Sequence, residues 1–180
     1  MLGPRIGIIG SDLSHGSSIT PKALQWAEEV GRLIAERGGL VISGGRGGVM
    51  EAVSKGAKQA GGLVVGIMPS METSEANPYV DVVITTGLGG VRNMLTVRTS
   101  DAVIMIAGGG GTLNELTVAH HLKPTVVLEG TGGWSDRIRS AAIDGEYLDE
   151  RREYKLHFAQ DPAAAVNLAF DLVSQKTDKT

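Results

Sequence analysis

Short apolar runs alternate with longer amphipathic stretches along this 180-residue chain. The central run, Asp101–Ala107, is continuously apolar after its first residue, which is typical of a strand that a parallel sheet buries on both faces. We predict strands at Arg5–Gly10, Leu40–Ser43, Leu63–Met68, Val80–Thr86, Asp101–Ala107, Thr125–Leu128 and, at an edge, Tyr154–Ala159.

The stretches between these runs have helical periodicity. Thr20-Pro21 predicts a helix start, because proline suits the first helical position. We predict helices at about 22–37, 49–60, 112–122 and 135–143, a short one that begins at Arg92, and a last one after Asp161-Pro162. This order of elements indicates a single Rossmann-like α/β domain over residues 1–180. Its sheet is expected to be doubly wound and mainly parallel, with a polar tail from about residue 174.

Glycine is the outlier in composition, with 26 residues, about twice the usual share of roughly 7%. The glycines gather where the predicted strands end, and they form four candidate turns: Gly10-Ser11, Gly44–Gly48, Thr86–Gly90 and Gly108–Gly111. Because the carboxyl ends of parallel strands share one edge of the sheet, and ligands bind there in open α/β folds, we expect the four turns to converge on one site.

The turn Gly108–Gly111 has the strongest chemical character. Glycine lets the backbone take positive φ and lets a ligand come close. Thr112 then opens a helix, whose free N–H groups and dipole favour an anion. Arg92 precedes this turn in sequence and Glu115 follows it, and arginine binds phosphate well. A second interpretation stays open, in which Thr112-x-x-Glu115 is a capping box. The turn is not a Walker loop, because no Gly-Lys-Ser/Thr follows.

Composition and charge exclude several classes of function and partner. The net charge is −3 without a basic run, so we expect no nucleic-acid partner. Cysteine is absent, which excludes disulfides and thiol catalysis. No apolar stretch approaches 18 residues and no signal-peptide pattern opens the chain, so we expect a cytoplasmic protein without a membrane partner.

Other catalytic and metal sites are not predicted. The first turn lacks the G-x-G-x-x-G of dinucleotide-binding enzymes, and no G-x-S-x-G elbow of a serine hydrolase occurs. Asp12 and His15 are interpreted as solvated loop residues. His120 and His121, near a predicted helix C-terminus, are interpreted as structural, so no metal site is expected.

The glycine segments resemble those of the LOG-like superfamily. It includes proteins often mislabelled lysine decarboxylases, cytokinin-nucleotide phosphoribohydrolases and molybdenum-cofactor carrier proteins. GGRGGVMEAVSKGA looks like the family's first phosphate loop. Arg92, Asp101 and GGGGTLNE follow in the family's order and spacing. The resemblance implies that Arg92 and Glu115 match the catalytic pair of the hydrolases. Together with the expected convergence of the turns, it gives a ligand-binding set of Gly10, Ser11, Gly44, Gly45, Arg46, Gly47, Gly48, Arg92, Asn93, Gly108, Gly109, Gly110, Gly111, Thr112 and Glu115.

The chain departs from the hydrolases at two positions. Asn93 stands where they have lysine, and Ala107 stands where their P-G-G-x-G-T-x-x-E motif begins with proline. ITTGLGGVRN and NPYVD look more like the molybdenum-cofactor-carrier branch, which binds its ligand without cleaving it.

Two functions follow from the resemblance. We favour a carrier-like protein for a phosphorylated heterocycle, either molybdenum cofactor or a nucleotide monophosphate, with no required cofactor. The alternative is a hydrolase that cuts the N-glycosidic bond of nucleoside 5′-monophosphates. The resemblance also implies a homodimer or homotetramer, to which Met94, Leu95 and Val97 could contribute contacts.

Overall fold

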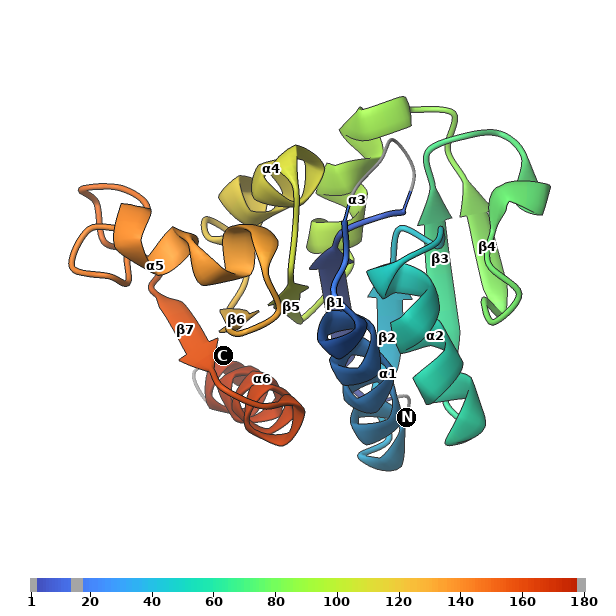
Figure 1. The fold of residues 1–180 in the computed structure, drawn as a ribbon, viewed down its shortest axis with the longest axis horizontal. Coiled ribbons are helices and arrows are strands. Elements are labelled where there is room, and N and C mark those ends of the chain that lie inside the picture. Colours follow the sequence, from blue (N-terminus) through green and yellow to red (C-terminus); the bar gives the residue numbers. More distant parts are fainter. Residues whose placement is uncertain (1–2, 14–17, 178–180) are drawn as a thin grey trace.

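Seven parallel strands form one sheet with helices on both faces (Figure 1). In the computed structural model, residues 3–13 and 18–177 are described. The strand order is β4-β3-β2-β1-β5-β6-β7, and every neighbouring pair runs parallel. The strands are β1 Arg5–Gly10, β2 Leu40–Ser43, β3 Val64–Met68, β4 Val82–Thr85, β5 Ala102–Ile106, β6 Thr125–Leu128 and β7 Leu156–Ala159. The predicted doubly wound parallel α/β fold is confirmed.

The helices follow the predicted order with small changes of boundary. The α-helices are α1 Pro21–Glu36, α2 Val49–Gln59, α3 Asn93–Arg98, α4 Gly110–Ala119, α5 Ile138–Ala141 and α6 Pro162–Thr177. The short 3-10 helices are η2 Thr73–Glu75, η3 Gly89–Arg92 and η4 Gly133–Asp136. The helix predicted at 135–143 is therefore split between η4 and α5. No described helix has the length and apolar character needed to cross a bilayer.

Two of the predicted helix starts are capped by side chains. Oγ1 of Thr20 accepts a hydrogen bond from the Ala23 N–H at 3.1 Å, and Oδ1 of Asp161 accepts one from the Ala164 N–H at 2.8 Å. Each cap satisfies one of the N–H groups that the first turn of a helix leaves without an internal partner.

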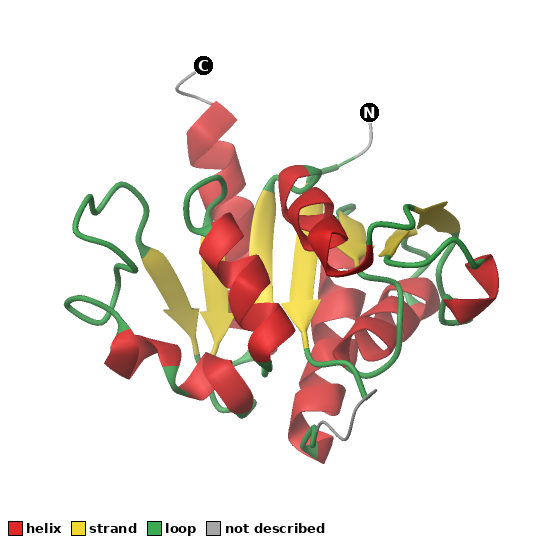
Figure 2. Ribbon diagram, turned by 90° about the horizontal axis from the view of Figure 1, so that it is seen from above, coloured by secondary structure: helices red, strands yellow, loops and turns green. Residues whose placement is uncertain are grey.

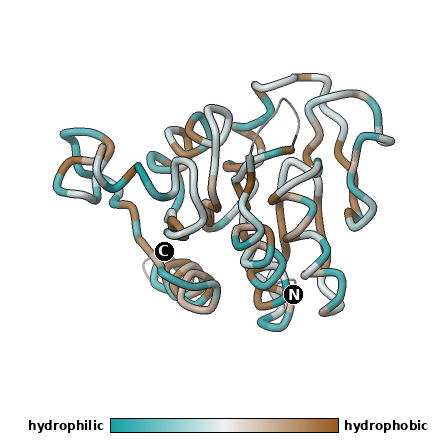
Figure 3. The backbone as a smooth tube through the Cα atoms, in the orientation of Figure 1, coloured by the Kyte–Doolittle hydropathy of each residue, from teal (hydrophilic) through white to brown (hydrophobic). Residues whose placement is uncertain are grey.

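The central strand β5 is buried on both faces. Ile104 and Ile106 belong to the core beneath α1, α2 and α6, whereas Val103 and Met105 belong to the core beneath α3, α4 and α5. Successive side chains of a strand point to opposite faces, so a strand covered on both sides must be apolar throughout. Figure 3 shows the sheet as the hydrophobic interior and the outer turns as hydrophilic.

One predicted subunit contact is wrong. Val97 is fully buried in the core on the α3 and α4 face of the sheet, so it is not available to a second copy of the chain. Met94 and Leu95, on the same helix, remain exposed.

The chain reverses direction across the sheet between β1 and β5. From β1 it builds outward through β2, β3 and β4, and it then returns to place β5 on the other side of β1. Figure 2 shows the resulting layer of strands with helices on either side. In open α/β sheets the crevice for a ligand lies at this switch point, outside the carboxyl ends of the strands.

Candidate functional site

A cavity of about 260 Å³ lies at the carboxyl ends of β1 and β5. It therefore occupies the switch point of the sheet. Its lining includes ten residues of the predicted ligand-binding set: Gly10, Ser11, Arg46, Arg92, Asn93, Gly109, Gly110, Gly111, Thr112 and Glu115. Segments that are far apart in sequence thus meet at one place.

The N-terminus of α4 forms one wall of the cavity. The helix begins at Gly110, with Gly109 in extended backbone as its N-cap, and no side chain caps it. A Cβ added at Gly109, Gly110 or Gly111 would meet nothing within 4 Å, so these glycines leave open space in front of the helix. The first N–H groups of a helix lack internal partners and carry the positive end of the dipole, so this wall suits an anion.

The capping-box interpretation of Thr112 and Glu115 is wrong. Thr112 is the third residue of α4 rather than its N-cap, because the helix begins two residues earlier. Oε1 of Glu115 instead accepts a hydrogen bond from Nη1 of Arg92 at 3.2 Å. The carboxylate of Glu115 therefore pairs with Arg92 at the cavity, and it does not cap the N-terminus of α4.

Arg92 and Glu115 form a buried ion pair. Their residues are 8% and 7% exposed, although both line the cavity. Nη1 of Arg92 also donates to Oδ1 of Asn93 at 2.6 Å, while its Nε is buried without a hydrogen-bond partner among the described residues. A buried donor without a partner is costly, and a bound anion is one way to satisfy it.

Burial shifts the pKa of both members of the pair. It raises the pKa of the Glu115 carboxyl to about 7, with the nearby Arg92 charge only partly opposing the shift. Burial also lowers the pKa of the Arg92 guanidinium, although arginine stays charged. Near neutral pH the carboxyl of Glu115 can therefore take up or release a proton, as a general acid or base must.

The turn Gly44–Gly48 packs against residues of the site and contributes one side chain to the cavity. It contributes the Arg46 side chain to the cavity, whereas the lining does not include its glycines, Gly44, Gly45, Gly47 and Gly48. A Cβ at Gly44 would lie 2.4 Å from Nη2 of Arg92, and one at Gly48 would lie 2.5 Å from the carbonyl oxygen of Ser11. At these two positions, glycine is needed for close packing against other parts of the site rather than for direct contact with the cavity.

Ser11 connects the two glycine turns. Its carbonyl oxygen accepts from the Val49 N–H at 3.0 Å, at the start of α2, and its Oγ accepts from the Gly108 N–H at 3.0 Å. Gly108 lies just outside the lining, with a φ of +115° that favours glycine. The end of β1 thus fixes both turns relative to each other.

The predicted convergence holds for three of the four turns. No residue of Thr86–Gly90 lines the cavity. The turn follows β4, the edge strand of the sheet, which is separated from β1 by β2 and β3. This segment contributes indirectly, because the η3 helix that continues it carries Arg92 to the cavity.

Three lining residues were not predicted: Ile8, Asp12 and Met50. Asp12 was interpreted as a solvated loop residue, but its Oδ2 lies 3.4 Å from Nε of Arg46. The sequence could have indicated a role for Asp12 in the site, because it follows Ser11, which was predicted to bind ligand, at the end of β1. His15 lies outside the described residues.

Ala107 precedes the glycine run in a left-handed conformation, with a φ of +56°. Its N–H donates to Oγ1 of Thr131 at 2.8 Å, and its carbonyl oxygen accepts from the N–H and Oγ of Ser135. Non-glycine residues adopt such a φ only where the surroundings impose it. The Thr131–Ser135 segment therefore holds the turn in a path that proline, which fixes φ near −65°, does not allow.

Comparisons with known proteins support the fold and identify the family. A model of the SLOG cluster4 family matches residues 4–166. An uncharacterized protein of Archaeoglobus fulgidus is 43% identical over 133 residues, which cover 70% of this chain and 84% of that protein. A cytokinin riboside 5′-monophosphate phosphoribohydrolase of Mycobacterium tuberculosis is 38% identical over 119 residues, which cover 61% of this chain and 64% of the enzyme. The solved structure of a molybdenum cofactor binding protein from Rippkaea orientalis superposes with a TM-score of 0.77 at 34% identity and covers 98% of each chain.

Proposed function

Because the chain belongs to the SLOG cluster4 family, we propose that it binds a phosphorylated heterocyclic ligand, a molybdenum-bearing pterin or a nucleotide, in the cavity at the carboxyl ends of β1 and β5. One observation carries the proposal: the uncapped N-terminus of α4 and the buried guanidinium of Arg92 line the same cavity. Both groups favour negative charge, and phosphate is the anion that suits them jointly.

The proposed binding mode places the phosphate against the backbone N–H groups of Gly109 to Thr112, with Arg92 beside it. Arg46, which is held by Asp12, adds a second positive charge at the cavity. The volume of about 260 Å³ is below the range of about 300–1,000 Å³ typical of drug-sized ligands, which favours one mononucleotide or pterin over a dinucleotide.

Two observations favour carriage over cleavage. By the sequence resemblance, Asn93 stands where the hydrolases have lysine, and its Oδ1 accepts a hydrogen bond from Arg92. The molybdenum cofactor binding protein also resembles the whole chain, whereas the phosphoribohydrolase covers 61% of it.

The pKa of Glu115 supports a second candidate, the hydrolase. In that reaction, Glu115 as carboxylate would take a proton from water as its oxygen bonds to the C1′ atom of the sugar. The C1′–N bond would break, and the proton that Glu115 took from water would pass to the leaving base nitrogen, giving free base and ribose 5-phosphate. A pKa of about 7 suits this task near neutral pH.

Native mass spectrometry of freshly purified protein tests the proposal, because a co-purified mass would identify the ligand class. A co-purified or added pterin or nucleotide that binds without release of base would support carriage. The proposal fails if no phosphorylated heterocycle binds, or if soaked AMP places its phosphate away from the N-terminus of α4.

Two variants separate the candidates. Arg92→Ala should weaken AMP binding by about 1.5–3 kcal/mol, the range for hydrogen bonds to charged groups, whereas Arg98→Ala, outside the cavity, should not. Chromatography of a panel of nucleoside monophosphates then detects any free base. Turnover by wild type that Glu115→Gln abolishes while binding persists would establish the hydrolase and reject carriage alone.

A further inference from the structure

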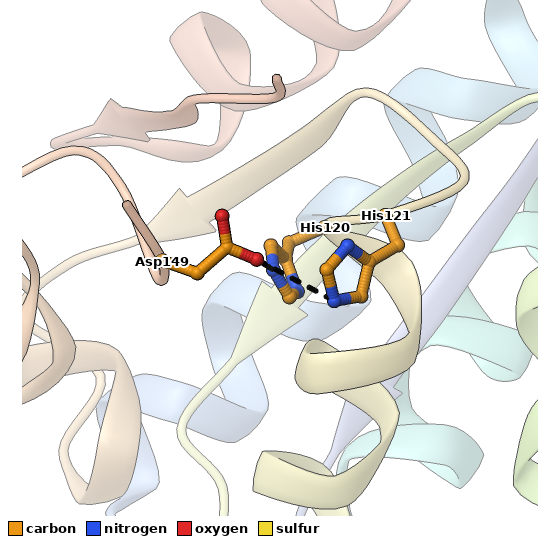
Figure 4. Close-up of side chains that lie close together, drawn as sticks. All are labelled: His120, His121 and Asp149. Carbon is orange, nitrogen blue, oxygen red and sulfur yellow. Dashed lines mark ion pairs between the residues drawn. The ribbon is translucent and has the colours of Figure 1, made fainter. Parts of the chain in front are cut away.

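His120, His121 and Asp149 meet at the C-terminal end of α4 (Figure 4). His120 is the C-cap of that helix, and Asp149 comes from the segment between α5 and β7. One ligand atom from each residue lies within 4.8 Å of the other two. Oδ2 of Asp149 is 3.5 Å from Nε2 of His120 and 3.8 Å from Nε2 of His121. None of the three residues lines the cavity, and the N-terminus of α4, which forms one cavity wall, lies about 15 Å away for ten residues.

The environment of His120 leaves one ring nitrogen free for a ligand. The residue is 7% exposed, and its Nδ1 lies 2.8 Å from the carbonyl oxygen of Thr117. A carbonyl can only accept, so Nδ1 carries the proton and donates. Nε2 is then left as a buried atom with no hydrogen-bond partner among the described residues. Metal-bound histidines are held in the same way, with the second ring nitrogen donating to a carbonyl or carboxylate.

Asp149 faces this nitrogen as a carboxylate. Its Oδ2 lies 2.6 Å from Nη2 of Arg151, and a carboxylate is the form that a guanidinium pairs with. With Nδ1 donating to Thr117, a lone pair on Nε2 and Oδ2 of Asp149 would face each other over 3.5 Å and repel. A cation between them removes the repulsion, and the negative end of the α4 dipole adds to its attraction.

The spacing also fits a metal ion. Zinc binds imidazole nitrogen and carboxylate oxygen at about 2.0–2.2 Å, so tetrahedral ligand atoms lie about 3.3–3.6 Å apart. Oδ2 of Asp149 is 3.5 Å from Nε2 of His120 and 3.8 Å from Nε2 of His121, so a small movement of the side chains would bring the ligand atoms to tetrahedral spacing. We propose that His120, His121 and Asp149 bind a divalent transition-metal ion of the zinc type, with water in the fourth position. This site was not expected from the sequence.

Arg151 is the competitor at this site. Its Nη2 lies 2.6 Å from Oδ2 of Asp149 and 3.1 Å from Nδ1 of His121. Its side chain is 59% exposed, so it can turn into solvent when a metal ion binds. In this structure the Arg151 guanidinium therefore supplies the positive charge beside Asp149 and His121 that a metal ion would supply when bound.

Zinc titration of tag-free protein against a chromophoric chelator tests the proposal. We expect one bound equivalent of Zn²⁺. His121→Ala and Asp149→Asn should each weaken binding by about 10–100-fold or more, since loss of even a residue that supports a ligand costs that much. Arg151→Ala should tighten binding. His157→Ala, on β7 and outside the cluster, is the matched control and should leave affinity unchanged.

Because His120 is buried, its replacement could unfold the chain, so a spectroscopic measurement takes the place of that variant. In ¹⁵N NMR of the histidine rings, Zn²⁺ should shift Nε2 of His120 and leave its Nδ1 protonated. The proposal is rejected if wild type binds no zinc, if His121→Ala and Asp149→Asn bind as wild type does, or if His120 carries protons on both nitrogens and ignores zinc. None of these outcomes depends on the ligand of the main cavity.

Discussion

Nη1 of Arg92 lies 3.2 Å from Oε1 of Glu115, and the two side chains are 10% and 9% exposed. Arg92 ends the η3 helix and Glu115 lies in the second turn of α4, so the pair joins two elements on the same face of the sheet. Removing two charges from water costs several kcal/mol per ion, and the mutual attraction often does no more than offset this. A buried pair at a cavity is therefore better explained by ligand chemistry than by stability.

The pH dependence of stability should reveal this cost. The pKa of Glu115 is about 7 in the folded protein and about 4.5 when unfolded, so between these values the folded state holds the proton and the unfolded state does not. Stability must then fall as pH rises through this window. Glu115→Gln cannot ionise, and we expect its free energy of unfolding, relative to wild type, to rise by about 3 kcal/mol between pH 4 and pH 8.

Urea denaturation of both proteins at several pH values measures this difference. All other ionisable groups are shared, so they cancel in the comparison. A difference that stays constant with pH would show that Glu115 keeps its ordinary pKa in the folded chain. A difference that favours wild type as pH rises would show that the folded state lowers this pKa, and either result contradicts the prediction.

Gly44→Ala should disturb the position of Arg92. The new Cβ would lie 2.4 Å from Nη2 of Arg92 and 2.8 Å from Sδ of Met50, so the guanidinium must move. We expect AMP affinity to fall by about 1–3 kcal/mol, the cost of a compromised charged hydrogen bond. Calorimetric titration measures the change. Gly90→Ala is the matched control, because a Cβ there meets nothing within 4 Å; equal affinities for the two variants would contradict the argument.

Ala107→Pro should destabilise the protein although it restores the proline of the related motif. The φ of +56° is closed to proline, and the N–H that donates to Thr131 would be lost. We expect a loss of about 3 kcal/mol or more in the free energy of unfolding. Ala107→Gly, which accepts this φ, should fold normally. Thermal and urea unfolding decide between the outcomes, and a proline variant as stable as wild type would exclude the left-handed turn.

Assembly into a homodimer or homotetramer remains a prediction, with the exposed side of α3 as its contact. Met94 is 47% exposed and Leu95 is 37% exposed, and Val91 just before them is 72% exposed. Met94→Asp would place a charge in an apolar contact, so we expect it to lower the mass of the assembly in solution. Light scattering after gel filtration measures that mass. Tyr154→Asp, just before the edge strand β7 and outside α3, should have no effect. A monomeric wild type would end this prediction.

The fold was predictable because its determinants are local. A strand covered on both faces, such as β5, must be apolar at every position, and helices that cover it must present apolar stripes, so both patterns can be read in sequence. Gly108–Gly111 was predictable for the same reason, since a run of glycines between a strand and a helix signals a turn that needs unusual backbone and open space.

The sequence by itself determined the order of strands and helices, the parallel sheet and the edge at which its glycine turns would gather. Only the tertiary structure decided which side chains meet there. Glu115 had two partners open to it, its own helix start or Arg92, and packing of η3 beside α4 selected Arg92. Asp149 reaches His120 across 29 positions in the same way. Such contacts depend on how elements far apart in sequence pack together, and local residue patterns do not specify that packing.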